Sequence, residues 1–215
     1  MIGSKSHIPI LTLKVNVLNT PLKRHRVAGW IKSQKTISCL QETHLIGNDT
    51  HRLKLKGQSK IYHANRKQKK RAGVVILISH KTDFKPIKIK KENEGHCIMI
   101  KGTNQQEALT ILNIYTPNIG APRFIKWVPG QQKDLDNHRI IVGDINTPLT
   151  VLDRSRRQKT HKETLDFNLT LDQLYLMTPT EYFTLQLQNI HSSHLHMEHI
   201  LRSTTCLVVK QALIN

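Results

Sequence analysis

The stretch Ile140-Ile141-Val142-Gly143-Asp144-Ile145-Asn146-Thr147-Pro148 is the most informative part of this chain. Its first three residues predict a short apolar strand that ends at the glycine. The polar side chains of Asp144 and Asn146 follow at once, which places them at the edge of a sheet. Ligands of α/β proteins bind at such strand ends, so this stretch predicts a functional site as well as a strand.

Three other apolar strands also end at polar residues. They are His7–Val17 with Asn16, Thr36–Leu40 with Glu42, and Ala108–Tyr115 with Tyr115 itself. Two acids with an amide partner suit a hard cation such as Mg²⁺, which prefers oxygen ligands. Such an ion can polarise a phosphate and activate water. The alternative is that these polar residues only cap strands at turns.

The rest of the chain predicts an α/β class with mixed sheets. Apolar runs indicate further strands, and helical spacing of apolar residues indicates helices. The expected strands are Ala72–Ser79, flanked by basic loops, and His96–Lys101, followed by a polar turn over Gly102–Glu107; the expected helices are Leu22–Ser33, Pro122–Asp136 and Thr160–Leu176. Beyond Thr178 the pattern degrades, with strands expected near Tyr182–Leu187 and Met197–Leu201.

Charge is the dominant feature of the composition. The 215 residues contain 33 Lys and Arg against 15 Asp and Glu, a net charge of +18. This excess favours a polyanionic partner, namely DNA with RNA as an alternative, although a basic surface that serves only solubility stays open. It also favours a nuclear location, with the run Arg66-Lys67-Gln68-Lys69-Lys70-Arg71 as a weak import signal.

Length and cysteine usage narrow the class of protein further. The length fits one domain, or at most two small ones. No run of 18 apolar residues occurs, so a membrane span is excluded. Three widely spaced cysteines argue against a disulfide framework and for an intracellular, reducing compartment. Cys39 and Cys97 lie in strand-like text and are predicted to be small core residues.

Four motifs in the same order resemble the endonuclease domain of mammalian LINE retrotransposons. They are Ile10-Leu11-Thr12-Leu13, Gln41-Glu42-Thr43-His44-Leu45, Leu112-Asn113-Ile114-Tyr115-Thr116-Pro117-Asn118 and Gly143-Asp144-Ile145-Asn146-Thr147-Pro148. That domain is similar to apurinic endonucleases and exonuclease-III-type enzymes of the endonuclease/exonuclease/phosphatase superfamily. The resemblance covers residues 1–173, which we expect to be the endonuclease-like core. Residues 174–215 are expected to be a degenerate C-terminal part of the same domain.

This resemblance implies a four-layer α/β/β/α sandwich of two mixed sheets with incomplete C-terminal strands. It implies Mg²⁺-dependent nicking of DNA by a monomer, with Mn²⁺ as an alternative ion. The implied roles are metal binding by Glu42, catalysis by Asp144, Asn146, Tyr115 and Glu198, and nucleic-acid contacts by Asn16, His44, Asn118 and Arg154. In the parent element, the nick primes a reverse transcriptase that is not among these 215 residues.

The chain departs from the family pattern at two places. Lys14 stands where the family carries an asparagine, and an ammonium there is expected to repel Mg²⁺ by several kcal/mol at about 4 Å. The family's final Ser-Asp-His motif is missing, and Glu198 replaces the Asp of an upstream Asp-His motif. Loss of a catalytic group of this kind costs about 10²–10⁴ in rate.

Two questions stay open from the sequence. One is whether the chain is a weakened endonuclease, an inactive relative that only binds nucleic acid, or a degenerate product with no selected role. The other is the role of the histidines of the segment 191–199. They could bind zinc, although their spacing matches no familiar zinc motif, or His199 or His196 could replace the missing catalytic histidine. These histidines are His191, His194, His196 and His199.

Overall fold

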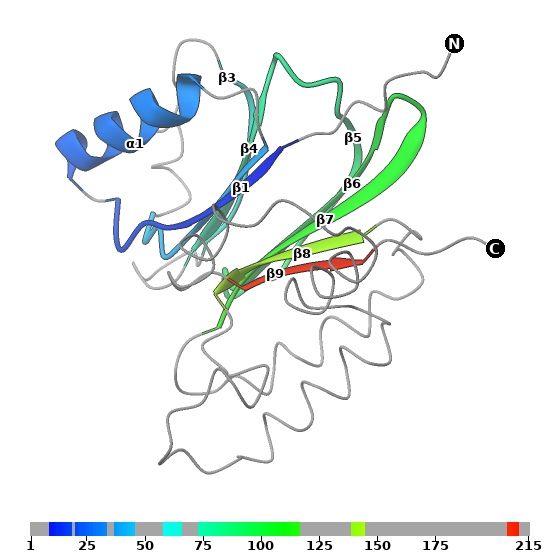
Figure 1. Cartoon of the computed structure of the whole chain (residues 1–215). Helices are drawn as coiled ribbons and strands as arrows, with labels where there is room; N and C mark the ends of the chain where they lie inside the picture. Colours follow the sequence, from blue (N-terminus) through cyan, green and yellow to red (C-terminus); the bar gives the residue numbers. More distant parts are fainter. Residues whose placement is uncertain are drawn as a thin grey trace, which may run out of the picture.

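The computed structural model describes residues 9–18, 20–33, 37–45, 58–65, 73–116, 139–144 and 206–210. These residues form one helix and nine strands in two sheets (Figure 1). The elements are β1 (Ile10–Lys14), α1 (Pro21–Ser33), β2 (Ile37–Gln41), β3 (Gln58–Ala64), β4 (Val74–Ser79), β5 (Lys85–Lys91), β6 (Cys97–Asn104), β7 (Glu107–Tyr115), β8 (Arg139–Asp144) and β9 (Cys206–Lys210).

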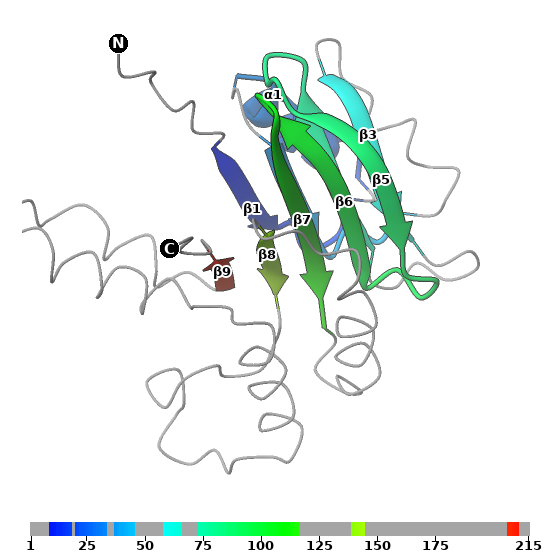
Figure 2. The same ribbon diagram turned by 90° about the vertical axis from the view of Figure 1, so that its right-hand side faces the viewer.

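Both sheets are mixed, and each contains one parallel pair next to antiparallel ones. The first sheet has the order β1-β2-β4-β3, and only β1 and β2 run parallel. The second has the order β5-β6-β7-β8-β9, and only β7 and β8 run parallel. Figure 2 shows the strands of the second sheet in front of the first. Each sheet therefore brings the carboxyl ends of two neighbouring strands to one edge.

The main core lies between the two sheets. Ile37, Cys39 and Ile76 from the first sheet pack there with Ile98 and Ile111 from the second, all at most 2% exposed. This burial follows from the pleat, because alternate residues of a strand point to the same face. Cys39 and Cys97 are both buried free thiols, as the sequence predicts.

Helix α1 covers the outer face of the first sheet (Figure 1). It begins at Pro21, which is well suited to the first helical position because its missing N–H would have no helical partner there. Val27 and Ile31 pack against Leu40 and Val75 of the sheet, as the predicted spacing requires. The opposite face of the second sheet is shielded too, since Met99 and Leu112 are at most 1% exposed.

The described residues therefore show a helix, a sheet and a second sheet in order, and the α/β sandwich predicted from the sequence is confirmed. The two remaining predicted helices, 122–136 and 160–176, and the strands expected at 182–187 and 197–201 lie outside the described residues. So does the boundary near residue 173. The part of the chain that the structure describes contains no helix long and apolar enough to cross a membrane.

Several predicted boundaries were wrong. The strand expected to reach Val17 ends at Lys14, because Asn16 and Val17 adopt positive φ angles of 43° and 68°. The turn expected over Gly102–Glu107 is confined to Gln105 and Gln106, and the strands continue on both sides. Two-residue turns with positive φ match the twist of a hairpin, so the strands extend further than composition suggests.

Three strands were missed. β3 and β5 were not predicted, and β5 (Lys85–Lys91) has no apolar pattern of burial, because it is mostly lysine and none of its residues is buried. It stands at the end of its sheet, where exposed lysines are common and discourage pairing with other chains. The third is β9, in the C-terminal part expected to be degenerate, and it pairs antiparallel with β8 from Arg139↔Lys210 to Gly143↔Cys206.

Candidate active site at the strand ends

Four polar side chains meet where the two parallel strand pairs end. Lys14 is the last residue of β1, and Glu42 directly follows β2. Tyr115 and Asp144 are the last residues of β7 and β8 and are paired in register. The two strands of a parallel pair end at the same edge, and the two sheets are stacked face to face. The four side chains from both sheets therefore form one cluster at this edge.

Backbone hydrogen bonds hold the first half of this group in place. Beyond β1 the chain stays bonded to the segment after β2, with Val15 N donating to Gln41 O (3.0 Å) and Val17 N to Glu42 O (2.8 Å). Glu42 itself has a φ of 56°, in the left-handed region that non-glycine residues rarely adopt. Such strain persists only where surrounding bonds enforce it, and it is typical of functional sites.

A buried pair of amides joins the two sheets directly behind the site. Gln41 Nε2 donates to Asn113 Oδ1 (2.6 Å), and Asn113 Nδ2 donates to the backbone carbonyls of Leu40 (3.1 Å) and Val75 (3.0 Å). Both amide residues are fully buried. Gln41 precedes Glu42, and Asn113 lies two residues before Tyr115 on the strand. The pair therefore sets the position of both functional side chains relative to each other.

Gly143 allows the close approach of β8 to β7 beside Tyr115 and Asp144. Gly143 precedes Asp144 and has a φ of 141°, and a Cβ built there would lie 1.8 Å from the carbonyl oxygen of Ile114 on β7. No side chain fits in that space. Beyond this point Thr116 N donates to Asp144 O (2.8 Å), which keeps the two chains together past the strand ends.

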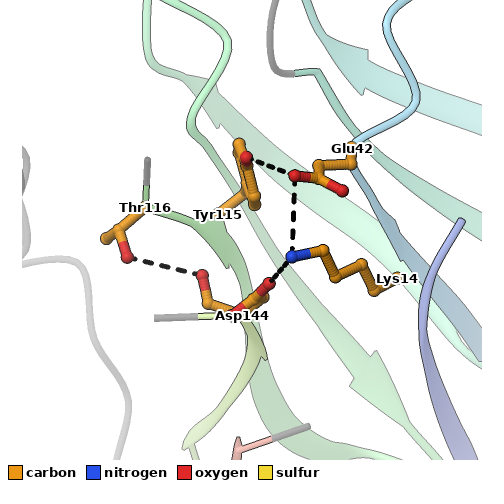
Figure 3. Close-up of polar contacts among 5 residues, drawn as sticks. All are labelled: Lys14, Glu42, Tyr115, Thr116 and Asp144. Atoms are coloured by element: carbon orange, nitrogen blue, oxygen red, sulfur yellow. Dashed lines mark hydrogen bonds and ion pairs between the residues drawn. The ribbon is translucent and has the colours of Figure 1, made fainter. Parts of the chain in front are cut away.

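The side chains form a short chain of polar contacts (Figure 3). Tyr115 Oη donates to Glu42 Oε1 at 2.5 Å. Lys14 Nζ lies 3.6 Å from the same Glu42 oxygen and 2.7 Å from Asp144 Oδ2. It also lies 5.9 Å from the centre of the Tyr115 ring. Figure 3 shows the ammonium reaching between the two carboxylates.

The electrostatics keep Tyr115 neutral and Lys14 charged. Burial, the hydrogen bond to Glu42 and the charges of Glu42 and Asp144 raise the pKa of Tyr115 well above its ordinary value of 10.0. Partial burial works to lower the pKa of Lys14, but its hydrogen bond to Asp144 and the charges of both carboxylates outweigh this effect. The pKa of Lys14 therefore lies above 10.5. The site holds a phenol that donates and an ammonium that is permanently charged near neutral pH.

The fit of a divalent cation to this arrangement can be judged from the donors. Glu42 and Asp144 supply the carboxylate oxygens that Mg²⁺ prefers. The place between them, however, is taken by the ammonium of Lys14. In the ranges that the structure describes, no cluster of three His, Cys, Asp or Glu side chains could hold a metal ion. As arranged here, the residues do not fit Mg²⁺.

The predicted site residues fall into three sets. Glu42, Tyr115 and Asp144 are brought together. Asn16 and His44 lie in the loops after β1 and β2, at the same edge; Asn16 is exposed, and its carbonyl accepts a bond from Lys23 Nζ (2.6 Å). The remaining four predicted positions, Asn118, Asn146, Arg154 and Glu198, lie outside the described residues, as do the histidines of the segment 191–199.

The sequence-based reasoning overlooked His96 as a neighbour of the site. Its ring stacks on Tyr115 with the centres 6.2 Å apart, and its Nδ1 lies 3.2 Å from the Tyr115 carbonyl oxygen. Glu92 accepts the backbone N–H of His96 at 3.0 Å and so orders the turn before β6. The sequence places a histidine at the start of a strand, a position that carries no signal of its own.

Comparison with solved structures identifies the fold. The chain is similar to the AP endonuclease LMAP of Leishmania major, with a TM-score of 0.67 and 15% identity over 93% of this chain and 78% of that one. It is similar to the endonuclease domain of TRAS1, a telomere-specific non-LTR retrotransposon, with a TM-score of 0.60 and 9% identity over 93% and 83% of the two chains.

A third similar structure is the 3′ phosphatase NExo from Neisseria, bound to a product DNA hairpin. Its TM-score is 0.60 with 17% identity, and the match covers 94% of this chain and 86% of that one. No protein-family model matches the sequence. At these identities the likeness shows the fold, which is that of the AP endonucleases.

Proposed function

We propose that this chain is a DNA-directed nuclease domain derived from a LINE-type retrotransposon, with weakened activity. The observation that carries the proposal is the meeting of Glu42, Tyr115 and Asp144 at the strand ends of both sheets. Its support comes from the similar structures, which include an AP endonuclease, a retrotransposon endonuclease domain and a phosphatase bound to DNA. The four sequence motifs add the LINE origin.

The side chains on this edge suit a phosphodiester as substrate. The phenol of Tyr115 stays protonated, so it can donate a hydrogen bond to an oxygen that gains negative charge. The carboxylate of Glu42 accepts from Tyr115 and thereby orients it. Asn146, Arg154, Asn118 and Glu198 complete the proposed set, with Asn146 beside the reacting phosphate and Arg154 on the DNA backbone. Mg²⁺ or Mn²⁺ is the expected cofactor, and the ammonium of Lys14 between Glu42 and Asp144 weakens its binding, which is the reason for the weakened activity.

The second candidate function is DNA binding without cleavage, and the position of Lys14 favours it. An ammonium 2.7 Å from Asp144 neutralises part of the charge that a nuclease of this fold would use for a metal ion. The basic surface remains, with a net charge of +18 and exposed lysines along β5. This candidate, like the first, predicts binding to nucleic acid and a nuclear location.

Nicking of supercoiled plasmid separates the two candidates. The purified chain is incubated with Mg²⁺, with Mn²⁺ or with EDTA, beside Glu42→Gln and the control Glu107→Gln, which alters an exposed carboxylate at the far end of β7. The weakened nuclease predicts slow, metal-dependent nicking that is lost in Glu42→Gln and kept in Glu107→Gln. Nicking that survives Glu42→Gln would refute the assigned site.

DNA binding is measured on the same proteins at several salt concentrations. Because lysine–phosphate contacts release counterions, affinity should fall steeply with salt, with a log–log slope of about −0.9 per phosphate contact. Salt-sensitive binding without nicking in any metal would establish the second candidate. Absence of both binding and nicking would remove both candidates.

A further inference from the structure

The ammonium of Lys14 stands at the one place in the described site where two carboxylates from different sheets converge. Lys14 ends β1 and Glu42 directly follows β2 of the first sheet, whereas Asp144 ends β8 of the second. The distances of 2.7 Å to Asp144 and 3.6 Å to Glu42 put a single positive charge within reach of both. Figure 3 shows that the side chain extends from β1 directly to this point.

The backbone bonds fix where the Lys14 side chain starts. It pairs in register with Gln41 at the end of β2, and Val15 N then bonds to Gln41 O. The side chain is 28% exposed, and the two carboxylates are 17% and 7% exposed. An ion pair this shielded is screened by solvent much less than one on the open surface.

Removing the Lys14 charge would leave two partly buried negative charges converging at this point, and like charges this close repel each other. A positive ion would relieve that repulsion. Carboxylate oxygens converging from two elements are the donors that Mg²⁺ and Mn²⁺ take. A neutral side chain at position 14 would therefore leave a place that favours a divalent ion.

We propose that the Lys14 ammonium is a tethered cation that occupies the place of a divalent metal ion between Glu42 and Asp144 and joins the two sheets without a metal. The native chain then binds divalent ions only weakly at this place, in keeping with the weakened activity proposed above. A neutral residue at position 14 turns the same place into a metal site. This inference rests on the proposed function only for the identity of the carboxylate pair.

The test measures Mn²⁺ binding directly, by the loss of the free-ion signal in electron paramagnetic resonance, and does not depend on catalysis. The full chain is compared with Lys14→Asn, with Lys14→Met, which keeps the aliphatic stem, and with Lys81→Asn, which removes an exposed lysine in a turn between β4 and β5. Both Lys14 variants should bind Mn²⁺ at least about tenfold more tightly than the native chain, because one repulsive charge is gone. Lys81→Asn should bind as the native chain does, and adding Glu42→Gln to Lys14→Asn should abolish the gain.

Thermal unfolding provides the second measurement. The melting temperature of the native chain should differ little between EDTA and Mn²⁺, whereas that of the Lys14 variants should be lower in EDTA and recover in Mn²⁺. Two results would overturn the inference: native binding of Mn²⁺ as tight as that of the variants, or Lys14 variants whose binding and melting ignore Mn²⁺. A Lys14→Asn protein that binds Mn²⁺ but does not nick DNA would leave this inference standing and count against the nuclease proposal alone.

Discussion

Replacing Asn113 with alanine should destabilise the protein, because this side chain carries hydrogen bonds that join the sheets behind the site. Its Nδ2 donates to the carbonyls of Leu40 and Val75, and its Oδ1 accepts from Gln41. Asn113 is fully buried, so water cannot replace these partners. The change removes three hydrogen bonds and leaves a small cavity.

The size of the effect follows from these contacts. A buried hydrogen bond between neutral groups contributes about 1 kcal/mol net, so three bonds give about 3 kcal/mol. Domains of this kind unfold with about 5–15 kcal/mol, so the loss is a large share of the total. With a urea dependence of about 2 kcal/mol per molar, the unfolding midpoint should fall by about 1.5 M.

Urea unfolding followed by far-ultraviolet circular dichroism measures this shift. Glu107→Ala is the matched control, since Glu107 is exposed on the same strand and its loss should change stability by less than about 0.5 kcal/mol. In a double-mutant cycle with Gln41→Ala, the double variant should lose less stability than the two single variants together, because both changes remove the same hydrogen bond. A midpoint shift below about 0.5 M with an unchanged slope would refute the assigned role of Asn113.

Two further predictions concern the backbone and the buried thiols. Gly143→Ala should lower the free energy of unfolding by about 4 kcal/mol or more, or prevent folding, because its Cβ would lie 1.8 Å from the Ile114 carbonyl oxygen. The control Gly29→Ala, with no atom within 4 Å of its Cβ, should be neutral or stabilising by up to about 1 kcal/mol. Equal soluble yields and melting temperatures for the two variants would contradict this reasoning. Burial raises the pKa of the Cys39 thiol, and burial together with the charge of Glu92 raises that of Cys97. The unfolded thiols ionise near pH 9.0, whereas the folded ones stay protonated. The free energy of unfolding should therefore not change through these thiols below pH 9, and it should fall as the pH rises further. The double variant Cys39→Ala/Cys97→Ala should fall less steeply between pH 9 and 10, and identical pH profiles in urea unfolding would contradict the prediction.

The sequence predicted the elements whose burial produces a recognisable apolar pattern, either a continuous run or a helical spacing. Strands such as Val74–Ser79 are buried at every residue and read as continuous apolar runs. The helix over Pro21–Ser33 shows Val27 and Ile31 on its inner face. β5 was not predicted, because it stands at the end of its sheet and none of its residues is buried. Its sequence therefore shows no pattern of buried apolar residues.

The candidate site was predictable only one strand at a time. Glu42, Tyr115 and Asp144 each follow or end an apolar strand, which is a local pattern visible in the sequence. Their meeting is not local, since Glu42 and Tyr115 are 73 positions apart and belong to different sheets. His96 had no such pattern, and it became a neighbour of the site only through the turn that stacks it on Tyr115.

The order of residues along the chain was therefore enough to predict the buried apolar strands and the polar side chains that stand at their ends, since both depend on short-range periodicity and turn chemistry. The tertiary structure alone decided that two parallel strand pairs end at the same edge. It also decided that the ammonium of Lys14 lies 2.7 Å from Asp144, 130 positions away in the sequence. Charge interactions act through space and depend on distance and burial, so the placing of Lys14 between two carboxylates was decided by the packing of two sheets.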